Sequence, residues 1–243
     1  MVHTSTRHRV LDVSKFLGQT NNMREMSPKE ISAIAQDLYV NLPWFVRLSQ
    51  KYRPYICPLH RIIKYVPNNS RVLDVGCGKG LFLGVLAKII PLEASIGFDF
   101  SARAIDCANM IKPRLSISEK RMAAIRFECR RAEEPWPEGL FNVVTMIDVI
   151  HHVPQSSQRK VLEQAAVKIS RGGKFILKDM ARRPRWRALM NRLHDLVIAR
   201  QWIHYVDFPT VEGWLSETGL KLMSSETIPM LWYGHELRIF ERV

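Results

Sequence analysis

The sequence lacks several features that would decide its class at once. None of its apolar runs approaches the roughly 18 residues that a membrane helix needs. The N-terminal residues 1–18 are basic but contain no apolar stretch of the kind that defines a secretory signal. The four cysteines form no C-x-x-C pair, so the sequence predicts neither a zinc site nor a disulfide scaffold. We therefore expect a cytoplasmic protein with reduced thiols at Cys57, Cys77, Cys107 and Cys129.

Acidic residues are scarce beside basic ones. The chain has 36 Lys and Arg against 23 Asp and Glu, a net charge of +13. The excess is concentrated in residues 171–200, where nine basic residues stand against Asp179 and Asp195. Such a surface either is simply solvated or favours an acidic partner such as phospholipid, nucleic acid or an acidic protein.

The N-terminal quarter predicts an arm followed by helices. Residues 1–26 are polar and lack periodicity, which predicts a flexible basic arm. Ser27, Pro28 and Glu30 have the spacing of a capping box with proline in the first turn, so a helix should begin here. A second amphipathic stretch begins at Pro43 and is punctuated by Pro54 and Pro58 before residues 59–66. We expect residues 27–66 to form a helical lid over a sheet.

The remainder, residues 67–243, alternates between strand and helix patterns. Gly172 and Gly173 are interpreted as the C-terminal stop of a helix expected at 156–170. A long basic amphipathic helix is expected at 184–200, and the last two strands have no helix between them, which predicts an antiparallel hairpin at the sheet edge. This order predicts an α/β fold with a doubly wound, mostly parallel seven-stranded sheet whose last strand is antiparallel. The expected strands are 71–75, 94–99, 123–129, 141–147, 174–178, 220–228 and 235–242, and the other expected helices are 79–89, 101–111, 156–170 and 210–218.

A glycine turn follows the first strand in V-L-D-V-G-C-G-K-G, residues 72–80. A phosphate P-loop would need G-x-x-x-x-G-K-[ST], which is missing, and the glycine spacing also departs from the dinucleotide fingerprint G-x-G-x-x-G. An S-adenosylmethionine loop needs an acid at the end of this strand for the ammonium group and a second acid at the end of the next strand for the ribose hydroxyls. Asp74 and Asp99 meet both requirements.

The quoted turn resembles motif I of the class I, Rossmann-like S-adenosylmethionine-dependent methyltransferases. G-F-D-F-S (97–101) resembles their second-strand motif, and R-G-G-K-F-I-L-K-D (171–179) their fifth strand. F-N-V-V-T-M-I-D-V-I-H-H-V (141–153) resembles the fourth strand of the subgroup with the menaquinone and ubiquinone methyltransferases. The resemblance covers about residues 65–243 and implies a methyltransferase domain there.

The resemblance implies a cofactor site. Asp74 and the turn would hold the methionine part, Asp99 the ribose, and Phe100 the adenine. The segment at Arg131 and Ala132 stands where the family often has D-A-E, so Ala132 would meet the adenine through its backbone. The usual Asp is Arg131 here, and the side-chain contact of that Asp to the adenine amine is therefore not carried over. The implied cofactor-binding residues are Asp74, Gly76, Cys77, Gly78, Gly80, Asp99, Phe100, Arg131, Ala132, Ile147 and Asp148.

An oxygen acceptor would also need a general base, typically His, Asp or Glu. His151 and His152 follow the fourth strand, Asp179 ends the fifth, and His235 begins the last, all at the edge where open α/β sheets bind ligands. Consecutive side chains point differently, so we expect only one of the two adjacent histidines to face the cleft. No cluster has metal spacing, so no metal site is predicted.

The leading functional hypothesis is a methyltransferase that acts on a small or carrier- or lipid-linked hydrophobic metabolite, with O-methylation favoured. An RNA methyltransferase is the alternative that the net charge supports, but the sequence has no N-P-P-Y motif, no catalytic P-C pair and no appended RNA-binding module. A third hypothesis is a non-catalytic cofactor-binding protein, and the intact glycine turn with both acids argues against it. The helices before Arg71 and the insertion 180–209 are expected to form the acceptor pocket, and their aromatic residues either line that pocket or simply fill the core of the lid. These residues are Tyr39, Trp44, Phe45, Tyr52, Tyr55, Trp186, Trp202, Tyr205 and Phe208.

The expected helix at 184–200 carries a partner prediction. Its apolar residues fall on one stripe and its arginines flank or oppose that stripe. This pattern favours peripheral contact of residues 182–192 with the anionic inner face of a membrane or with an acidic acyl carrier protein that delivers the acceptor. The stripe consists of Trp186, Leu189, Met190, Leu193 and Val197.

Overall fold

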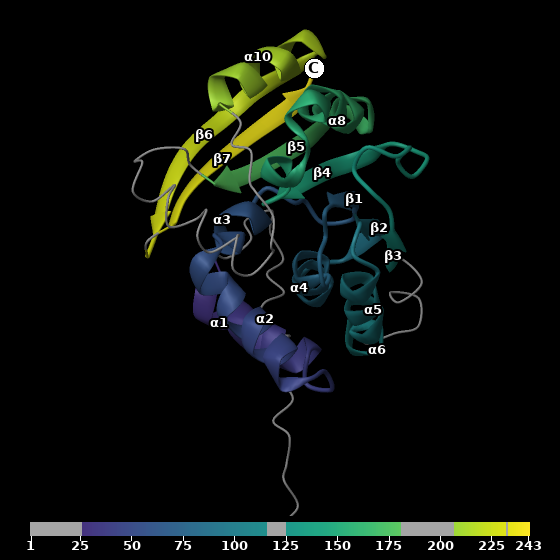
Figure 1. Ribbon diagram of the computed structural model, residues 1–243, viewed down its shortest axis with the longest axis vertical. Coiled ribbons are helices and arrows are strands. Elements are labelled where there is room, and N and C mark those ends of the chain that lie inside the picture. The colour runs from purple at the N-terminus through teal and green to yellow at the C-terminus, as the bar shows by residue number, and fades with distance from the viewer. Residues whose placement is uncertain (1–25, 116–124, 181–206, 232) are drawn as a thin grey trace, which may run out of the picture.

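The computed structural model describes residues 26–115, 125–180, 207–231 and 233–243, which build one seven-stranded sheet with helices on both faces (Figure 1). The strand order is β3-β2-β1-β4-β5-β7-β6, and only β7 runs antiparallel to its neighbours. This topology confirms the predicted doubly wound α/β sheet with an antiparallel last strand. The strands are β1 (Ser70–Val75), β2 (Leu92–Asp99), β3 (Ile125–Cys129), β4 (Phe141–Ile147), β5 (Ile169–Met180), β6 (Leu220–Met230) and β7 (Tyr233–Arg242).

Alternating side chains divide the core between the two faces of the sheet. In β1, Val72 packs on one face, whereas Leu73 and Val75 pack on the other, and all three are fully buried. The first face is covered by helices that include α1 (Pro28–Leu38) and α4 (Leu81–Ile89), and the second by α8 (Gln155–Val167) and α10 (Phe208–Glu217). The remaining helices are α2 (Trp44–Ile56), α3 (Leu59–Ile63), α5 (Ala102–Met110) and α6 (Lys112–Leu115).

The predicted start of α1 is confirmed in detail. The Ser27 side chain accepts the Glu30 backbone N–H, and the Glu30 carboxylate accepts the Ser27 backbone N–H at 2.8 Å, so both halves of the capping box form. The buried face of α1 packs on α4, where a Cβ added to Gly84 would lie 2.9 Å from Leu38 Cδ1. The N-terminal helices therefore share the core of one sheet face, while their role as a lid remains a prediction.

The helix expected at 156–170 is shorter than predicted, and its supposed glycine stop belongs to a strand. Helix α8 ends at Val167 and β5 already begins at Ile169. Gly172 has φ +72°, and a Cβ on Gly173 would lie 2.8 Å from a backbone carbonyl oxygen. The β4–β5 register shifts at this point, so the glycines permit an irregularity in the strand.

The second amphipathic stretch is helical, and of its two prolines Pro54 lies inside the helix. Helix α2 runs through Pro54 and ends at Ile56, two residues before Pro58. A proline so close to the helix end removes one backbone hydrogen bond from the last turn and leaves the earlier turns intact. The next helix, α3, is shorter than the stretch expected at 59–66.

Two predicted segments lie outside the described residues. One is the N-terminal arm, of which only residue 26 is described, and the other is the basic segment 182–192 with the helix expected at 184–200. Among the helices of the described ranges, none has the length and apolarity to cross a bilayer. All four cysteines are free thiols.

Candidate active site

The glycine turn after β1 has three residues in left-handed backbone conformations. Gly76, Gly78 and Gly80 have φ values of +68°, +53° and +81°. A Cβ at Gly76 would lie 2.3 Å from Val149, and one at Gly80 would lie 2.9 Å from Phe127, so packing within the protein already requires these two glycines. At Gly78, an added Cβ would meet no atom within 4 Å. The backbone at Gly78 is therefore open to an approaching ligand.

Asp99 ties the end of β2 to this turn. Its Oδ2 accepts the backbone N–H of Gly78 at 2.9 Å, and its Oδ1 accepts the backbone N–H of Ser101 at 2.9 Å. A carboxylate has about four acceptor positions, so these two bonds leave capacity for hydroxyl groups of a ligand. The structure thus places Asp99 beside the open glycine, as the cofactor prediction requires.

Asp74 is buried beneath the turn. Its Oδ1 accepts a 2.6 Å hydrogen bond from the Thr145 hydroxyl on β4, and the residue is 2% exposed. Burial, with a contribution from the charge of Asp99, raises the pKa of Asp74 to about 7. A ligand ammonium at this point would stabilise the carboxylate form, because an opposite charge nearby favours ionisation.

One pocket joins the turn to the N-terminal helices. Among the predicted residues, Asp74, Gly76, Cys77, Gly78 and Ile147 line it. Its wall also contains residues that the sequence interpretation missed, which are Gln50 and Arg53 of α2, Leu59 of α3, and Lys79, Leu81, Phe82 and Ala104.

Gln50 and Arg53 stand three residues apart, so they share one face of α2. That spacing was the only signal in the sequence, and it does not show that this face meets a turn more than 20 residues further along the chain. Sequence reasoning therefore had no means of assigning either residue to the pocket.

The predicted adenine contacts lie at the same edge of the sheet but outside this pocket. Phe100 directly follows β2 and is 55% exposed. Arg131 and Ala132 follow β3; the Ala132 carbonyl accepts a 2.8 Å bond from the Trp136 indole, and the Arg131 backbone N–H donates to Glu134. The roles of these residues toward adenine remain predictions.

The aromatic residues predicted to form the acceptor pocket are absent from the lining of the pocket at the glycine turn, and their role toward an acceptor remains a prediction. Tyr39 is buried and its hydroxyl donates a 2.6 Å hydrogen bond to the Lys79 carbonyl. Phe208 is buried in the core of the opposite sheet face. The other described members face solvent from α2, namely Trp44, Phe45, Tyr52 and Tyr55. The remaining three residues of the set, Trp186, Trp202 and Tyr205, lie outside the described residues.

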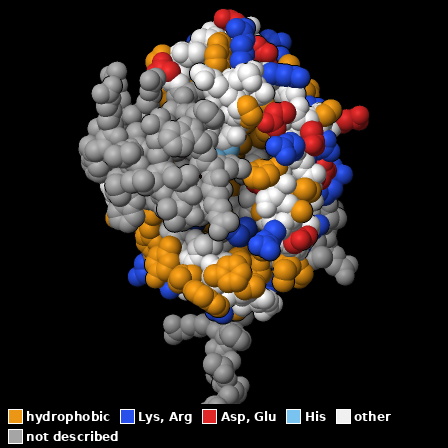
Figure 2. All heavy atoms as spheres, in the orientation of Figure 1, with side chains coloured by type: hydrophobic (Ala, Val, Ile, Leu, Met, Phe, Trp, Pro, Cys, Tyr) orange, Lys and Arg blue, Asp and Glu red, His pale blue; other side chains and the backbone are white. Residues whose placement is uncertain are grey.

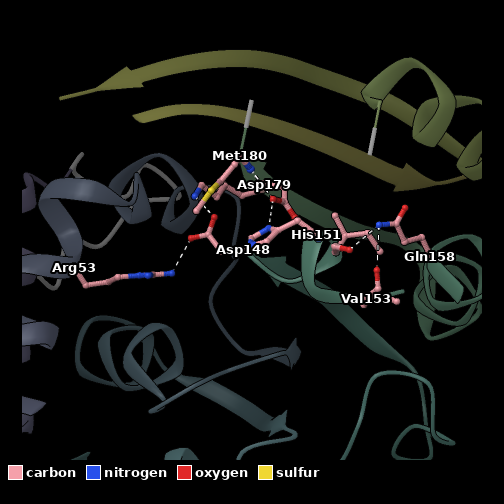
Figure 3. A network of polar contacts seen from close by, with 9 residues as sticks. Arg53, Asp148, His151, Val153, Gln158, Asp179 and Met180 are labelled. Carbon is pink, nitrogen blue, oxygen red and sulfur yellow. Dashed lines mark hydrogen bonds and ion pairs between the residues drawn. The ribbon is translucent and has the colours of Figure 1, made fainter. Parts of the chain in front are cut away.

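A buried charged network occupies the edge of β4 and β5 (Figure 3). Asp148 follows β4 with φ +58°, and its carboxylate pairs with Lys178 of β5 and, at 2.7 Å, with Arg53 of α2. Lys178 is fully buried. Burial alone would raise the pKa of Asp148, but the charges of Lys178 and Arg53 hold it well below its usual range. Asp148 is therefore a permanent carboxylate that joins the N-terminal helices to the sheet.

His151 and Asp179 form a second buried pair. The His151 Nδ1 lies 2.5 Å from Asp179 Oδ1, and the His151 backbone N–H donates to Asp179 Oδ2. In Figure 3 the His151 ring lies between Asp179 and Asp148. The His152 ring lies tilted against that of His151, with the ring centroids 4.1 Å apart, and is less buried. The structure therefore places the Asp179 carboxylate against the first of the two adjacent histidines.

His235 of β7 is buried near the same network. Burial, together with the charges of Lys178 and Arg53, lowers its pKa to about 3. Its imidazole is accordingly neutral near pH 7 and a weak base. The four predicted catalytic residues thus meet at one edge of the sheet, but in different electrostatic environments.

Comparison with known proteins identifies the family. A family model described as a methyltransferase domain matches residues 48–225. The chain belongs to this methyltransferase family. It is an S-adenosylmethionine-dependent methyltransferase with a Rossmann-like sheet, as its motifs predict.

Several curated relatives of this methyltransferase share one name. The Ubiquinone biosynthesis O-methyltransferase of Xanthomonas euvesicatoria pv. vesicatoria is 27% identical over 187 residues, which are 68% of this chain and 72% of the relative. The protein of the same name from Coxiella burnetii strain RSA 493 is 29% identical over 135 residues, covering 51% of this chain and 53% of the relative.

Solved structures show the same fold. Magnesium protoporphyrin IX methyltransferase from Synechocystis PCC 6803, solved with bound SAH, superposes with a TM-score of 0.64 at 15% identity and covers 87% of this chain and 94% of that one. YcgJ from Bacillus gives a TM-score of 0.60 at 17% identity, with coverage of 76% and 98%. At these identities the likeness concerns the fold alone.

The pocket of this methyltransferase fits its cofactor. S-adenosylmethionine supplies a methyl group activated by a sulfonium centre. The open backbone at Gly78 gives a ligand room, Asp74 supplies a carboxylate for an ammonium, and Asp99 retains acceptor capacity for hydroxyls. Arg53 and Lys79 add positive charge to the same wall, where a ligand carboxylate would be stabilised.

Proposed function

We propose that this methyltransferase methylates a hydroxyl oxygen of a small hydrophobic acceptor, free or linked to a carrier or lipid. The observation that carries the proposal is the buried His151–Asp179 pair at the cofactor edge of the sheet. Oxygen acceptors require removal of a proton, and an imidazole oriented by a carboxylate is suited to that task. The shared name of the curated relatives, Ubiquinone biosynthesis O-methyltransferase, supports the same acceptor atom.

In this proposal His151 is the general base. The Asp179 carboxylate accepts a hydrogen bond from Nδ1–H, which fixes the tautomer and directs Nε2 away from Asp179 toward an acceptor hydroxyl. With S-adenosylmethionine bound, His151 Nε2 would take the hydroxyl proton as the acceptor oxygen bonds to the methyl carbon and the carbon–sulfur bond breaks, so that S-adenosylhomocysteine leaves, and Asp179 would stabilise the resulting imidazolium. The surrounding burial excludes water from the pair, which is 1% and 2% exposed.

The other two predicted histidines take lesser roles. A base whose pKa is near 3 accepts protons poorly at neutral pH, so His235 serves as a neutral neighbour of the buried charges. His152 contacts the His151 ring and helps to hold it in place. Arg53, which joins the pocket wall to Asp148, positions the methionine carboxylate and the sulfonium end together.

The RNA alternative rests on net charge alone, and no feature of the described site favours it. The predicted contact of residues 182–192 with an anionic membrane or an acidic carrier protein stays a proposal, because these residues lie outside the described ranges.

The test is a methyl-transfer assay with labelled S-adenosylmethionine against a panel of phenols, amines and carbon acids. We expect phenol products, and a turnover that falls about 100-fold in His151→Ala and in Asp179→Asn while cofactor affinity stays within a factor of a few. His152→Ala is the matched control and should retain most activity. Products methylated only on nitrogen or carbon, or full activity of His151→Ala, would refute oxygen methylation with this base.

A further inference from the structure

Helix α2 presents its apolar side chains to solvent. Along the helix these residues recur every three to four positions, so they form one stripe about three turns long on the outer face. The exposed fractions are 74% for Trp44, 58% for Phe45, 47% for Leu48, 51% for Tyr52 and 38% for Tyr55. A single exposed apolar residue is ordinary, but a contiguous patch of this kind marks an interaction surface.

The surroundings of the stripe are positively charged. Between Asp37 and Asp74 the chain carries six Lys or Arg and no acidic residue, and three of the six, Arg53, Arg61 and Lys64, pair with Asp148 or Glu226. Arg47 and Lys51 belong to α2 itself, and neither is found in an ion pair with the described residues. Figure 2 shows the result, a band of hydrophobic side chains interspersed with basic ones where Figure 1 places α2.

We infer that the outer face of α2, defined by Trp44, Phe45, Leu48, Tyr52 and Tyr55, docks on an anionic lipid surface. An amphipathic helix with Trp and Phe on one side and Lys or Arg beside them lies in the plane of a membrane interface. Trp and Tyr are also the side chains that concentrate at that depth, because each has an apolar ring and a polar group.

Charge and shape disfavour a second copy of this chain as the occupant. A two-fold contact through α2 would bring Arg47 and Lys51 close to their own copies with no acid on the helix to offset them. The stripe is also convex, on a single helix, and suits a soft medium that deforms around it.

The inner face of the same helix lines the cofactor pocket, so docking of the outer face would also position that pocket. Gln50 and Arg53 project from the opposite side of α2 into the cofactor pocket. A helix lying on the lipid would therefore hold the pocket close to the membrane interface, within reach of an acceptor dissolved in it. The inference concerns where the enzyme binds and holds whether or not the acceptor atom is oxygen.

The experiment is sedimentation of the full chain with vesicles of phosphatidylglycerol and phosphatidylcholine, compared with phosphatidylcholine alone, at low and high salt. We expect binding to the anionic vesicles that weakens with salt. Trp44→Gln/Leu48→Gln should lower the partition coefficient at least about tenfold, and Arg47→Gln/Lys51→Gln by a similar factor at low salt. The matched control is Met223→Gln/Leu231→Gln, which removes apolar residues equally exposed outside α2 and should bind like the wild type.

Two readouts locate the contact and check the fold. Brominated lipid should quench the fluorescence component that Trp44→Phe removes. Calorimetric titration with S-adenosylmethionine without lipid should give the same affinity for every variant, since the altered side chains lie outside the pocket. A failure of that titration in the wild type would count against the cofactor site and not against docking.

Several outcomes would overturn the inference. One is the absence of wild-type binding to anionic vesicles; another is binding that survives both α2 variants but is lost in Arg183→Glu/Arg185→Glu/Arg187→Glu. A dimer in light scattering that Trp44→Gln/Leu48→Gln dissociates would assign the face to a second copy. Capture of an acidic carrier protein through α2, without vesicle binding, would assign it to a protein partner.

Discussion

The two halves of the candidate site are built in different ways. The cofactor half uses the turn after β1 and the end of β2, so its main residues lie between Asp74 and Ser101 and act largely through backbone groups. The proposed acceptor half lies at the ends of β4, β5 and β7, and it meets the pocket wall through the Arg53–Asp148 contact, which joins residues 95 positions apart. The first half is a local motif, whereas the second exists only after the chain has folded.

This difference predicts different consequences of mutation. The cofactor half contains few buried ion pairs, so its side chains should affect affinity more than stability. The acceptor half contains the buried ion pair of Lys178 and Asp148. Burying either charge alone would cost much free energy, and their mutual attraction offsets that desolvation cost. Its charged residues should therefore act on stability first.

The largest effect is expected in the acceptor half. Asp148→Asn leaves the fully buried Lys178 without its carboxylate and should lower the free energy of unfolding by about 3–5 kcal/mol in urea denaturation. Replacing both partners with Asp148→Leu/Lys178→Leu should restore much of the loss. Glu163→Gln, in an exposed pair with Arg159, is the control and should change stability by less than about 1 kcal/mol. Equal effects of the buried and exposed variants would erase the contrast between the halves.

A smaller effect is expected in the cofactor half, and on affinity. Asp99→Ala removes the acceptor of two backbone N–H groups and of the ribose hydroxyls, so S-adenosylmethionine should bind about 1.5–3 kcal/mol more weakly in calorimetry. Asp106→Ala, an exposed acid on the following helix, should bind normally. Wild-type affinity in Asp99→Ala would show that this strand end does not hold the cofactor.

The two halves should also differ in the sign of their pH dependence. Folded Asp74 keeps its proton up to about pH 7, whereas the unfolded chain releases it near pH 3.8, so this group makes the cofactor-free protein less stable as pH rises through that window. His235 is neutral down to about pH 3 when folded but gains a proton near pH 6.5 when unfolded, so its contribution to stability is lost as pH falls through that window.

Urea denaturation of the cofactor-free protein between pH 4 and 7.5 measures both groups. Asp74→Asn should be more stable than the wild type near neutral pH, and His235→Asn should lose less stability on acidification. Parallel pH curves for the wild type and both variants would contradict the assigned protonation states.

The sequence predicted the elements of the cofactor half well because their signals are local. A buried strand, glycines and a helix in immediate succession have few alternative folds, and the ends of β1 at Val75 and of β2 at Asp99 were predicted to the residue. The capping box at Ser27 is equally local, since both of its hydrogen bonds form within one turn.

The failures have equally physical causes. Gly172 and Gly173 are compatible with a helix stop or with a strand irregularity, and only the pairing of β5 with β4 decides between them. The pairing of Arg53 with Asp148 depends on how α2 packs against the sheet, which periodicity does not encode. The outward direction of the α2 aromatics was missed because an apolar stripe normally faces the core.

The hydrogen bond from the buried Tyr39 hydroxyl to the Lys79 carbonyl links the end of α1 to the glycine turn after β1. Three glycines of that turn have positive φ, and fixing their backbone in one conformation costs conformational entropy. Local opening of α1 would release this constraint, so opening and cofactor binding are thermodynamically coupled. Bound cofactor should then slow amide hydrogen exchange in α1, a helix absent from the residues that line the pocket.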